Sequence, residues 1–447
     1  MDWEYLPSLL LEEIFSLLPM KDRYSCSLVC KSWQESVFSR SVWRTMIITD
    51  RSFTRRKFTM YKGYSRELEH KRIQRCLGRV GHLFSSIVFT PISDFYNLYE
   101  ILHVLVAFQE FFDEYPMPLL DAFHFTFSCE SRGQSGTFVY GTGGQIFAEF
   151  RKFLANLRGI KYLKLNQLLL GNADAQVLLA DLTRNCADTV VTLEMLNSSQ
   201  DNCPQFHVPM FHVLQTLTIS PHNLNDEIII MLSQNGLPEL VITQDQYTPK
   251  TLIPVSPEAW YEARKICSRM RVKLQVIGQS REDILHQIGA PVNAVVYETP
   301  YTLISASSVI TTADLYGDTL QFYGHKCLPR THNGRSFNER ADSSLLLLVR
   351  SCSKLQTLVV RDRVSTATVL LIARECRQLQ TFYVRLNAVI KRMDWPREPN
   401  WSPEFYNWLK TNSRSYERMQ EEVSKIFGEN WRPLTDKEFV KLCGPSN

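Results

Sequence analysis

The chain has 447 residues, of which 44% are hydrophobic and 21% charged, and its formal net charge is +4. This length exceeds the usual capacity of one hydrophobic core, so two units or an elongated repeat array are expected. The composition is typical of a globular protein, and so small a net charge does not by itself indicate a nucleic-acid binder.

The first 43 residues predict three short helices. Pro7 suits the first turn of a helix, and apolar residues from Leu11 onward recur at the i, i+3, i+4, i+7 spacing of one helical face. Pro19 ends this helix, Asp22 is the expected N-cap of a second one, and a third runs to Trp43. So small a bundle cannot bury all of its leucines, and some apolar surface is left for a partner.

The same segment resembles the F-box, the motif that docks onto the adaptor Skp1 of cullin-RING ubiquitin ligases. The resemblance covers Leu6-Pro7, the Leu-x-x-Ile-Phe spacing that ends at Phe15, Asp22-Arg23, the Leu-Val-Cys-Lys-x-Trp run that ends at Trp33, and Trp43. Leu9 departs from it, because the family often has an acidic residue there. The resemblance implies that the following residues make or support a Skp1-binding surface: Leu6, Pro7, Leu10, Leu11, Ile14, Phe15, Leu18, Val29 and Trp33. The alternative is an N-terminal helical cap without this role.

Residues 51–79 are strongly basic, with ten lysines and arginines against two glutamates. We expect a solvated connector that leads into a helix from about Arg66 to Leu77. The alternative is a patch that binds RNA, DNA or an acidic degron. Its aromatic residues are not interleaved regularly enough to indicate single-stranded nucleic acid, so nucleic-acid binding is not expected.

From about residue 80 the sequence repeats itself. Cys352-Ser-Lys-Leu-Gln-Thr and Cys376-Arg-Gln-Leu-Gln-Thr share four identical residues at an offset of 24, and Leu214-Gln-Thr is a further copy. The copies share the frame Φ-x-x-Φ-x-Φ, which also begins at Leu120, Ile160, Val190, Leu237 and Val292. Leu274-Val276 and Leu320-Phe322 keep its last two positions.

The last two apolar positions of this frame alternate as on a strand with one buried face, and helical stretches such as 344–351 and 369–376 lie between them. Each strand–helix unit leaves an apolar side uncovered until a neighbour stacks on it. A period of 23 to 25 residues is typical of leucine-rich repeats, so a divergent solenoid with insertions is predicted. The alternative is an irregular α/β domain.

Three further stretches interrupt or follow the array. The glycine-rich residues 129–145 lack the Gly-Lys-Ser/Thr of a phosphate-binding loop and predict a flexible loop, and residues 326–343 predict a polar excursion. In the tail, Ser402 is expected to cap a helix that begins at Pro403, and a second helix spans about 414–427. These helices are expected to cover the end of the array.

No catalytic or metal-binding pattern is present. The sequence lacks GxSxG, HExxH and RING-type cysteine spacing, and its eleven cysteines predict reduced thiols in the cytosol or nucleus. No apolar run approaches the length of a membrane span. Because solenoids often bind along the strand-lined face, the candidate substrate contacts are residues that flank the strands and are expected to point outward: Gln356, Arg361, Gln380, Tyr383 and Arg385.

The order of these features resembles F-box proteins with divergent leucine-rich repeats. The predicted architecture is α/β, with an F-box at 1–48, a basic connector at 49–79, a leucine-rich-repeat solenoid at 80–392 and a helical C-terminal cap at 393–447. The resemblance implies a non-catalytic substrate receptor of an Skp1–cullin–F-box ubiquitin ligase. Its partners would be Skp1, cullin-1 through Skp1, and a protein substrate, with no cofactor. The alternative is a Skp1-binding scaffold that acts without cullin.

Overall fold

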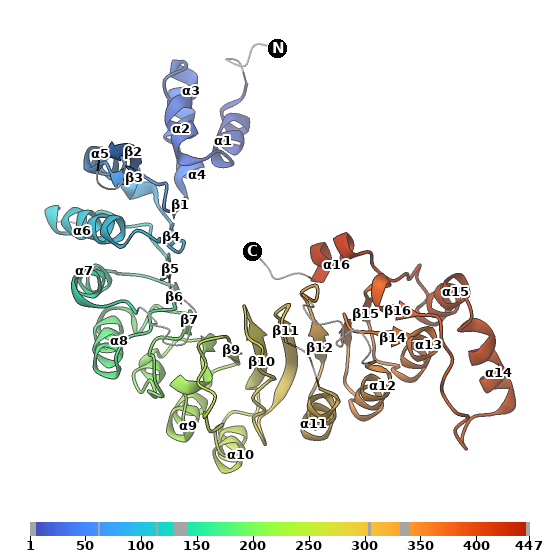
Figure 1. The fold of residues 1–447 in the computed structure, drawn as a ribbon. Helices are drawn as coiled ribbons and strands as arrows, with labels where there is room; N and C mark the ends of the chain where they lie inside the picture. Colours follow the sequence, from blue (N-terminus) through green and yellow to red (C-terminus); the bar gives the residue numbers. More distant parts are fainter. Residues whose placement is uncertain are drawn as a thin grey trace. The chain divides into compact units, whose positions relative to one another are not determined.

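The computed structural model describes residues 6–60, 63–112, 115–128, 141–302, 305–330 and 340–443 (Figure 1). The chain divides into two compact units, Met1–Thr218 and Ile219–Asn447. In both units strands and helices alternate along the chain, and successive strands of the main sheet pair in parallel. The predicted class, a small helical N-terminal region followed by repeated strand–helix units, is confirmed.

The first unit begins with four short helices rather than three. They are α1 (Ser8–Ser16), α2 (Met20–Cys26), α3 (Lys31–Val37) and α4 (Arg40–Trp43). The predicted second helix is divided because Cys30 has an extended backbone and its sulfur accepts a hydrogen bond from the Trp33 N–H, which starts α3. The predicted N-cap at Asp22 is wrong, since Pro19 occupies that position and Asp22 lies in the first turn of α2.

A layer of parallel strands and a layer of helices follow. The strands, in their order in the sheet, are β1 (Thr45–Ile48), β4 (Ser86–Phe89), β5 (Ala122–Thr126), β6 (Tyr162–Asn166), β7 (Thr192–Leu196) and β8 (Thr216–Ile219). The helices are α5 (His70–Val80), α6 (Phe95–Phe111), α7 (Gly144–Ala155) and α8 (Asn172–Cys186). Ile160, Leu163 and Leu165 are all at most 2% exposed, so the three apolar positions of the repeat frame are core positions, as predicted. Phe84, Ile87 and Phe89 fit the same frame, which the sequence analysis missed.

The basic connector is not an irregular linker. It contains an antiparallel hairpin of β2 (Thr54–Thr59) and β3 (Gly63–Leu68), and α5 follows at His70. Arg66 therefore lies in a strand and not in the predicted helix. The Asn97 side chain on α6 fixes the base of the hairpin, because it accepts a hydrogen bond from the Leu68 N–H and donates one to the Arg66 carbonyl. Since β1 already pairs with β4, the strand–helix units begin ahead of this segment.

The second unit has the same two layers. Its strands are β9 (Glu239–Gln244), β10 (Arg271–Ile277), β11 (Val292–Glu298), β12 (Phe322–His325), β13 (Thr357–Val360) and β15 (Thr381–Val384), in this order in the sheet. Its helices are α9 (Asp226–Gln234), α10 (Pro257–Ile266), α11 (Ala306–Tyr316), α12 (Asp342–Ser351) and α13 (Thr366–Glu375). The two-residue strands β14 (Val364–Ser365) and β16 (Val389–Ile390) pair separately. Short 3-10 helices lie at Gly81–Leu83 and Val208–Met210 in the first unit and at Pro221–Asn223 and Leu386–Ala388 in the second.

For one strand, the prediction assigned the wrong residues to the core-facing positions. On β12 the buried large side chains are Tyr323 and His325, and Leu320 in the preceding turn is also buried, so the frame is complete and starts at Leu320. Phe322 is only partly buried and packs on the opposite side of the sheet. The error arose because a tyrosine and a histidine, rather than aliphatic residues, fill the two strand positions.

The tail contains the two predicted helices and a third. These are α14 (Pro403–Asn412), α15 (Tyr416–Phe427) and the unpredicted α16 (Asp436–Cys443). Ser402 caps α14 by accepting a hydrogen bond from the Phe405 N–H, as predicted. Phe439 of α16 lies in a buried cluster with Val359 of β13, against which Phe322 and Tyr383 pack. The tail therefore crosses onto the strand side of β12, β13 and β15.

In three places among the described residues, a carboxylate accepts hydrogen bonds from both the backbone N–H and the hydroxyl of a serine in the neighbouring strand–helix unit. Asp50 accepts hydrogen bonds from the backbone N–H and the hydroxyl of Ser93 in the first unit. Asp226 does the same with Ser256, and Asp342 with Ser365, in the second unit. Ser256 and Ser365 are in turn the N-caps of α10 and α13. Each carboxylate thereby fixes the start of an element in the next repeat.

Replacing Asp342 with alanine is expected to destabilise the second unit by about 2–3 kcal/mol, because Ser365 and Thr368 lose a shared charged acceptor at a site that is 6% exposed. Burial raises the pKa of Asp342, but hydrogen bonds from Thr368, Arg340 and Ser365 outweigh burial and hold it below its ordinary value. A lowered folded-state pKa contributes stability above the unfolded-state value of about 4, and this contribution is lost as the pH falls through the folded-state pKa. Urea unfolding at several pH values should show a wild-type advantage at neutral pH that shrinks in acid. An advantage that is constant with pH would contradict the role of the carboxylate.

Candidate functional site

Helix α1 presents a stripe of apolar side chains to solvent. Leu10, Ile14 and Leu17 follow the i, i+4, i+7 spacing of one helical face and are 48%, 40% and 81% exposed. Leu9 beside them is 77% exposed, and Pro7 at the N-cap is also exposed. Apolar residues gathered on one face of a surface helix are typical of a site that another protein covers.

The other face of α1 holds the helical domain together. Leu11 and Phe15, four residues apart, are each 1% exposed. The Phe15 and Trp33 rings meet edge to face with their centroids 5.1 Å apart, which joins α1 to α3. The two faces therefore separate residues that hold the domain together from residues free to contact a partner.

Arg23 fixes the position of the first helix relative to the fourth. Its guanidinium donates hydrogen bonds to the Ser16 and Leu18 carbonyls at the end of α1, at 2.8 and 2.9 Å, and to the Val42 carbonyl of α4. It also lies over the Trp43 ring. Carbonyls at a helix end lack partners within the helix, so Arg23 satisfies the last carbonyl of α1 and one just beyond it, and thereby holds the exposed stripe in place.

The turn between α2 and α3 adds further exposed apolar side chains. Leu28 and Val29 are 70% and 58% exposed, and Tyr24 on α2 is also exposed. The extended Cys30 that ends this turn starts α3 and leaves both residues in solvent.

The predicted Skp1-binding residues fall into three groups. Those exposed and free to contact a partner are Pro7, Leu10, Ile14 and Val29; those partly buried are Leu6, Leu18 and Trp33; those buried are Leu11 and Phe15. The prediction omitted four exposed apolar residues, which are Leu9, Leu17, Tyr24 and Leu28. The excess of leucines over what so small a bundle can bury was the signal that could have found most of them.

The predicted substrate contacts are only partly available. Gln356 and Gln380 are exposed where β13 and β15 begin. Arg361 was expected to point outward, and this is wrong: it is 1% exposed and donates to the Thr299 and Thr302 carbonyls at 2.8 and 3.0 Å. Tyr383 packs against the cluster around Phe439.

Arg385 is paired within the chain. Its guanidinium donates two hydrogen bonds to Asp436, at 2.7 and 3.2 Å, at the start of α16. Helix α16 therefore occupies part of the strand side on which the substrate contacts were predicted.

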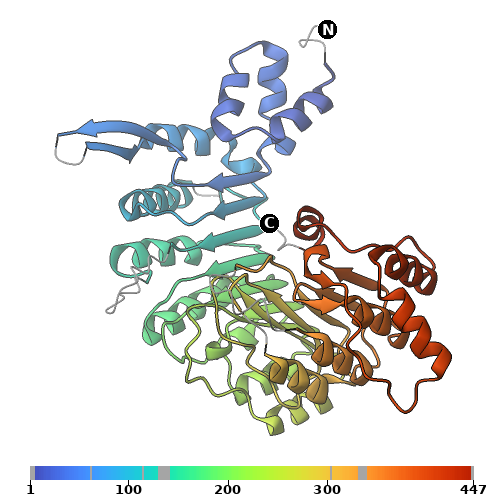
Figure 2. The ribbon, with the colours of Figure 1, turned by 45° about the vertical axis from the view of Figure 1, so that its right-hand side comes forward.

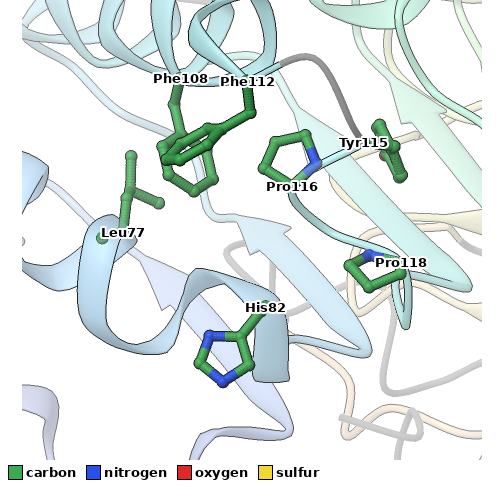
Figure 3. Close-up of a pocket in the computed structure, with 8 residues that line it drawn as sticks. Leu77, His82, Phe108, Phe112, Tyr115, Pro116 and Pro118 are labelled. Carbon is green, nitrogen blue, oxygen red and sulfur yellow. The ribbon is translucent and has the colours of Figure 1, made fainter.

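A pocket of about 470 Å³ opens in the first unit between α5 and the end of α6 (Figure 3). Its walls are mostly apolar and include Leu77, Phe108, Phe112, Pro116 and Pro118. His82 and Tyr115 are its titratable groups, and burial raises the pKa of Tyr115 to about 12. Such a lining has no evident nucleophile or set of ligating groups.

Other predicted features lie partly outside the described residues. These are the glycine-rich loop, of which 129–140 is not described, and the polar excursion, of which 331–339 is not described. Among the residues that the structure describes, no group of three or more His, Cys, Asp or Glu side chains is placed to hold a metal ion. In the same part of the chain no helix combines the length and apolar character needed to cross a bilayer.

A comparison with known proteins finds a match to a protein family at the N-terminus. The F-box-like family model matches residues 3–49. The F-box/LRR-repeat protein 12 of Mus musculus is 38% identical over 80 residues, which is 18% of this chain and 23% of that protein. A chain in the crystal structure of the Rad7 and Elc1 complex in yeast is similar with a TM-score of 0.38 and 12% identity, over 88% of this chain and 92% of that one. The helices α1 to α4 thus form an F-box-like domain.

Proposed function

We propose that this protein is the substrate-recognition subunit of an Skp1–cullin-1–F-box ubiquitin ligase. The observation that carries the proposal is the exposed apolar stripe of α1 within a segment that matches the F-box-like family. Skp1 would cover Pro7, Leu10, Ile14 and Val29 directly, while Leu11, Phe15 and Trp33 would support that surface from inside. Leu6 and Leu18 would lie at its border.

The strand–helix units would bind a protein substrate and hold it near the conjugating enzyme. The contribution of this chain would then be geometric rather than catalytic, because positioning a substrate lysine raises its effective concentration at the enzyme. Gln356 and Gln380 remain candidate substrate contacts, and Tyr383 and Arg385 are candidates where α16 leaves them accessible. The bound substrate would be ubiquitinated and degraded by the proteasome, in the cytoplasm or the nucleus.

In the order of its features, the whole chain resembles F-box-only protein 33, and this resemblance stays a prediction. It rests on the order of F-box, basic segment and divergent repeats, and on local stretches such as the one that ends at Leu355.

The experiment is affinity purification of the full chain, and of a chain without residues 1–48, from proteasome-inhibited cells. Skp1 and cullin-1 are expected with the full chain and absent with the truncated one, whereas a substrate should be retained by both. Recovery of Skp1 without cullin-1 would instead favour a Skp1-binding scaffold. Recovery of neither would contradict both proposals.

A further inference from the structure

The basic segment forms a defined surface of the first unit. The β2–β3 hairpin extends outward from the neighbouring helices (Figure 2). Residues two apart on a strand, and residues paired across strands, share a face. The pairs Arg56–Arg66 and Phe58–Tyr64 therefore lie on one side of the hairpin, which we call the basic hairpin face.

Two arginines stand directly opposite each other on this face. Arg56 and Arg66 are cross-strand partners and both are exposed. Like charges in this arrangement destabilise a hairpin. Among the described residues, the ion pairs of the basic segment join Lys57 to Glu67, Arg72 to Glu69 and His70 to Glu100, and none involves Arg56 or Arg66. Neither guanidinium therefore has a carboxylate partner among the described residues, which leaves both available to an anionic partner.

Phe58 and Tyr64 help to distinguish between two kinds of anionic partner, a nucleic acid and an acidic protein segment. The Phe58 and Tyr64 rings lie 5.1 Å apart and tilted, and the Arg56 guanidinium lies 4.2 Å from the centre of the Tyr64 ring. Both rings are exposed, at 59% and 66%, but they contact each other. Proteins that bind single-stranded nucleic acid instead offer successive open rings for base stacking. A single pair of rings in contact with each other does not provide a series of stacking surfaces for bases.

An acidic peptide fits both the charges and the exposed apolar side chains of this face. The planar fork of each guanidinium can bind a carboxylate through two parallel hydrogen bonds. Phe58 and Met60, which are 59% and 90% exposed, can contact aliphatic side chains between the acidic ones. Helix α5 follows with Lys71 and Arg75, exposed and four residues apart on one helical face, which extends the positive field.

We propose that the basic hairpin face binds an acidic segment of a partner protein, in which aspartates and glutamates are interspersed with aliphatic residues. This surface is separate from the apolar stripe of α1, so the inference does not depend on the proposed Skp1 binding.

The informative variant is Arg66→Glu. It replaces two opposed arginines with an Arg–Glu pair, so the melting temperature should stay the same or rise. Binding of a labelled peptide of alternating acidic residues and leucines, measured by fluorescence anisotropy near physiological salt, should weaken by about tenfold or more. If Arg66 had only a structural role, its substitution would weaken peptide binding only by also lowering the melting temperature.

Arg377→Glu is the matched control, since Arg377 is exposed, lies in the second unit and has the same change of charge. It should leave peptide binding within about twofold of the wild type. Ile14→Ala should also leave peptide binding unchanged, and Arg66→Glu should leave Skp1 binding unchanged, so each proposal can fail alone. No peptide binding by the wild-type chain, or equal losses in Arg66→Glu and Arg377→Glu, would overturn the inference. Tighter binding of a single-stranded oligonucleotide that Arg66→Glu abolishes would assign the face to nucleic acid instead.

Discussion

The Ile14→Ala variant is expected to bind Skp1 about 5- to 150-fold more weakly than the wild-type chain, with an unchanged melting temperature. Ile14 is 40% exposed at the centre of the α1 stripe, so its truncation removes partner contact without opening a cavity in the domain. Truncating a large apolar side chain at an interface centre typically costs about 1–3 kcal/mol of binding free energy. Isothermal titration calorimetry with purified Skp1 measures the loss.

Leu11→Ala on the same helix is the informative contrast. Leu11 is 1% exposed, so its truncation should lower the stability of the helical domain by about 2–5 kcal/mol. Leu347→Ala, at a 39% exposed position on α12 in the second unit, should change neither binding nor stability measurably. If Ile14→Ala bound Skp1 as the wild type does, the exposed stripe would not be the contact surface.

The Arg361→Ala variant is expected to destabilise the second unit by about 3–5 kcal/mol. Arg361 is almost fully buried between β13 and the segment around Thr299 and Thr302. The carbonyls of these two threonines accept hydrogen bonds from its two terminal nitrogens. Its truncation leaves these acceptors and the neighbouring Asp362 without their cation and opens a cavity. The midpoint of urea unfolding, followed by circular dichroism, measures the change.

Arg377→Ala serves as the exposed arginine control and should lie within about 0.5 kcal/mol of the wild type. A loss below about 1 kcal/mol for Arg361→Ala would mean that this arginine does not hold the segment in place, and would return it to the candidate substrate contacts.

The repeat frame could be predicted from sequence because it reflects burial with a fixed period. Leu214, Leu217 and Ile219 are at most 7% exposed, and on β8 the last two alternate with partly buried threonines, as the alternation of a half-buried strand requires. The frame that starts at Leu320 was assigned wrongly, because Tyr323 and His325 take core positions that aliphatic residues usually fill. The burial of Arg361 depends on carbonyls about sixty residues earlier in the chain, and no local pattern records such a contact.

The hairpin and α16 were missed for different reasons. In β2 the run Arg-Arg-Lys hides the alternation of a strand, because both faces of the exposed hairpin are charged. Helix α16 is only eight residues long, and it is held by Phe439 and Cys443, which pack on distant strands, and by the pairing of Asp436 with Arg385. At the N-terminus the F-box-like segment could be recognised from the sequence, but only the packing, as of Phe15 on Trp33, separates buried Leu11 from exposed Leu10.

The measurement that tests the central claim most directly is calorimetric titration of purified Skp1 into the full-length chain. A saturable complex with one Skp1 per chain, a Kd of about 1 μM or tighter and a negative change in heat capacity would be the signature of apolar side chains leaving water at the α1 stripe. A folded, monodisperse chain that gives no binding to Skp1 would contradict the assignment of that stripe as a docking surface.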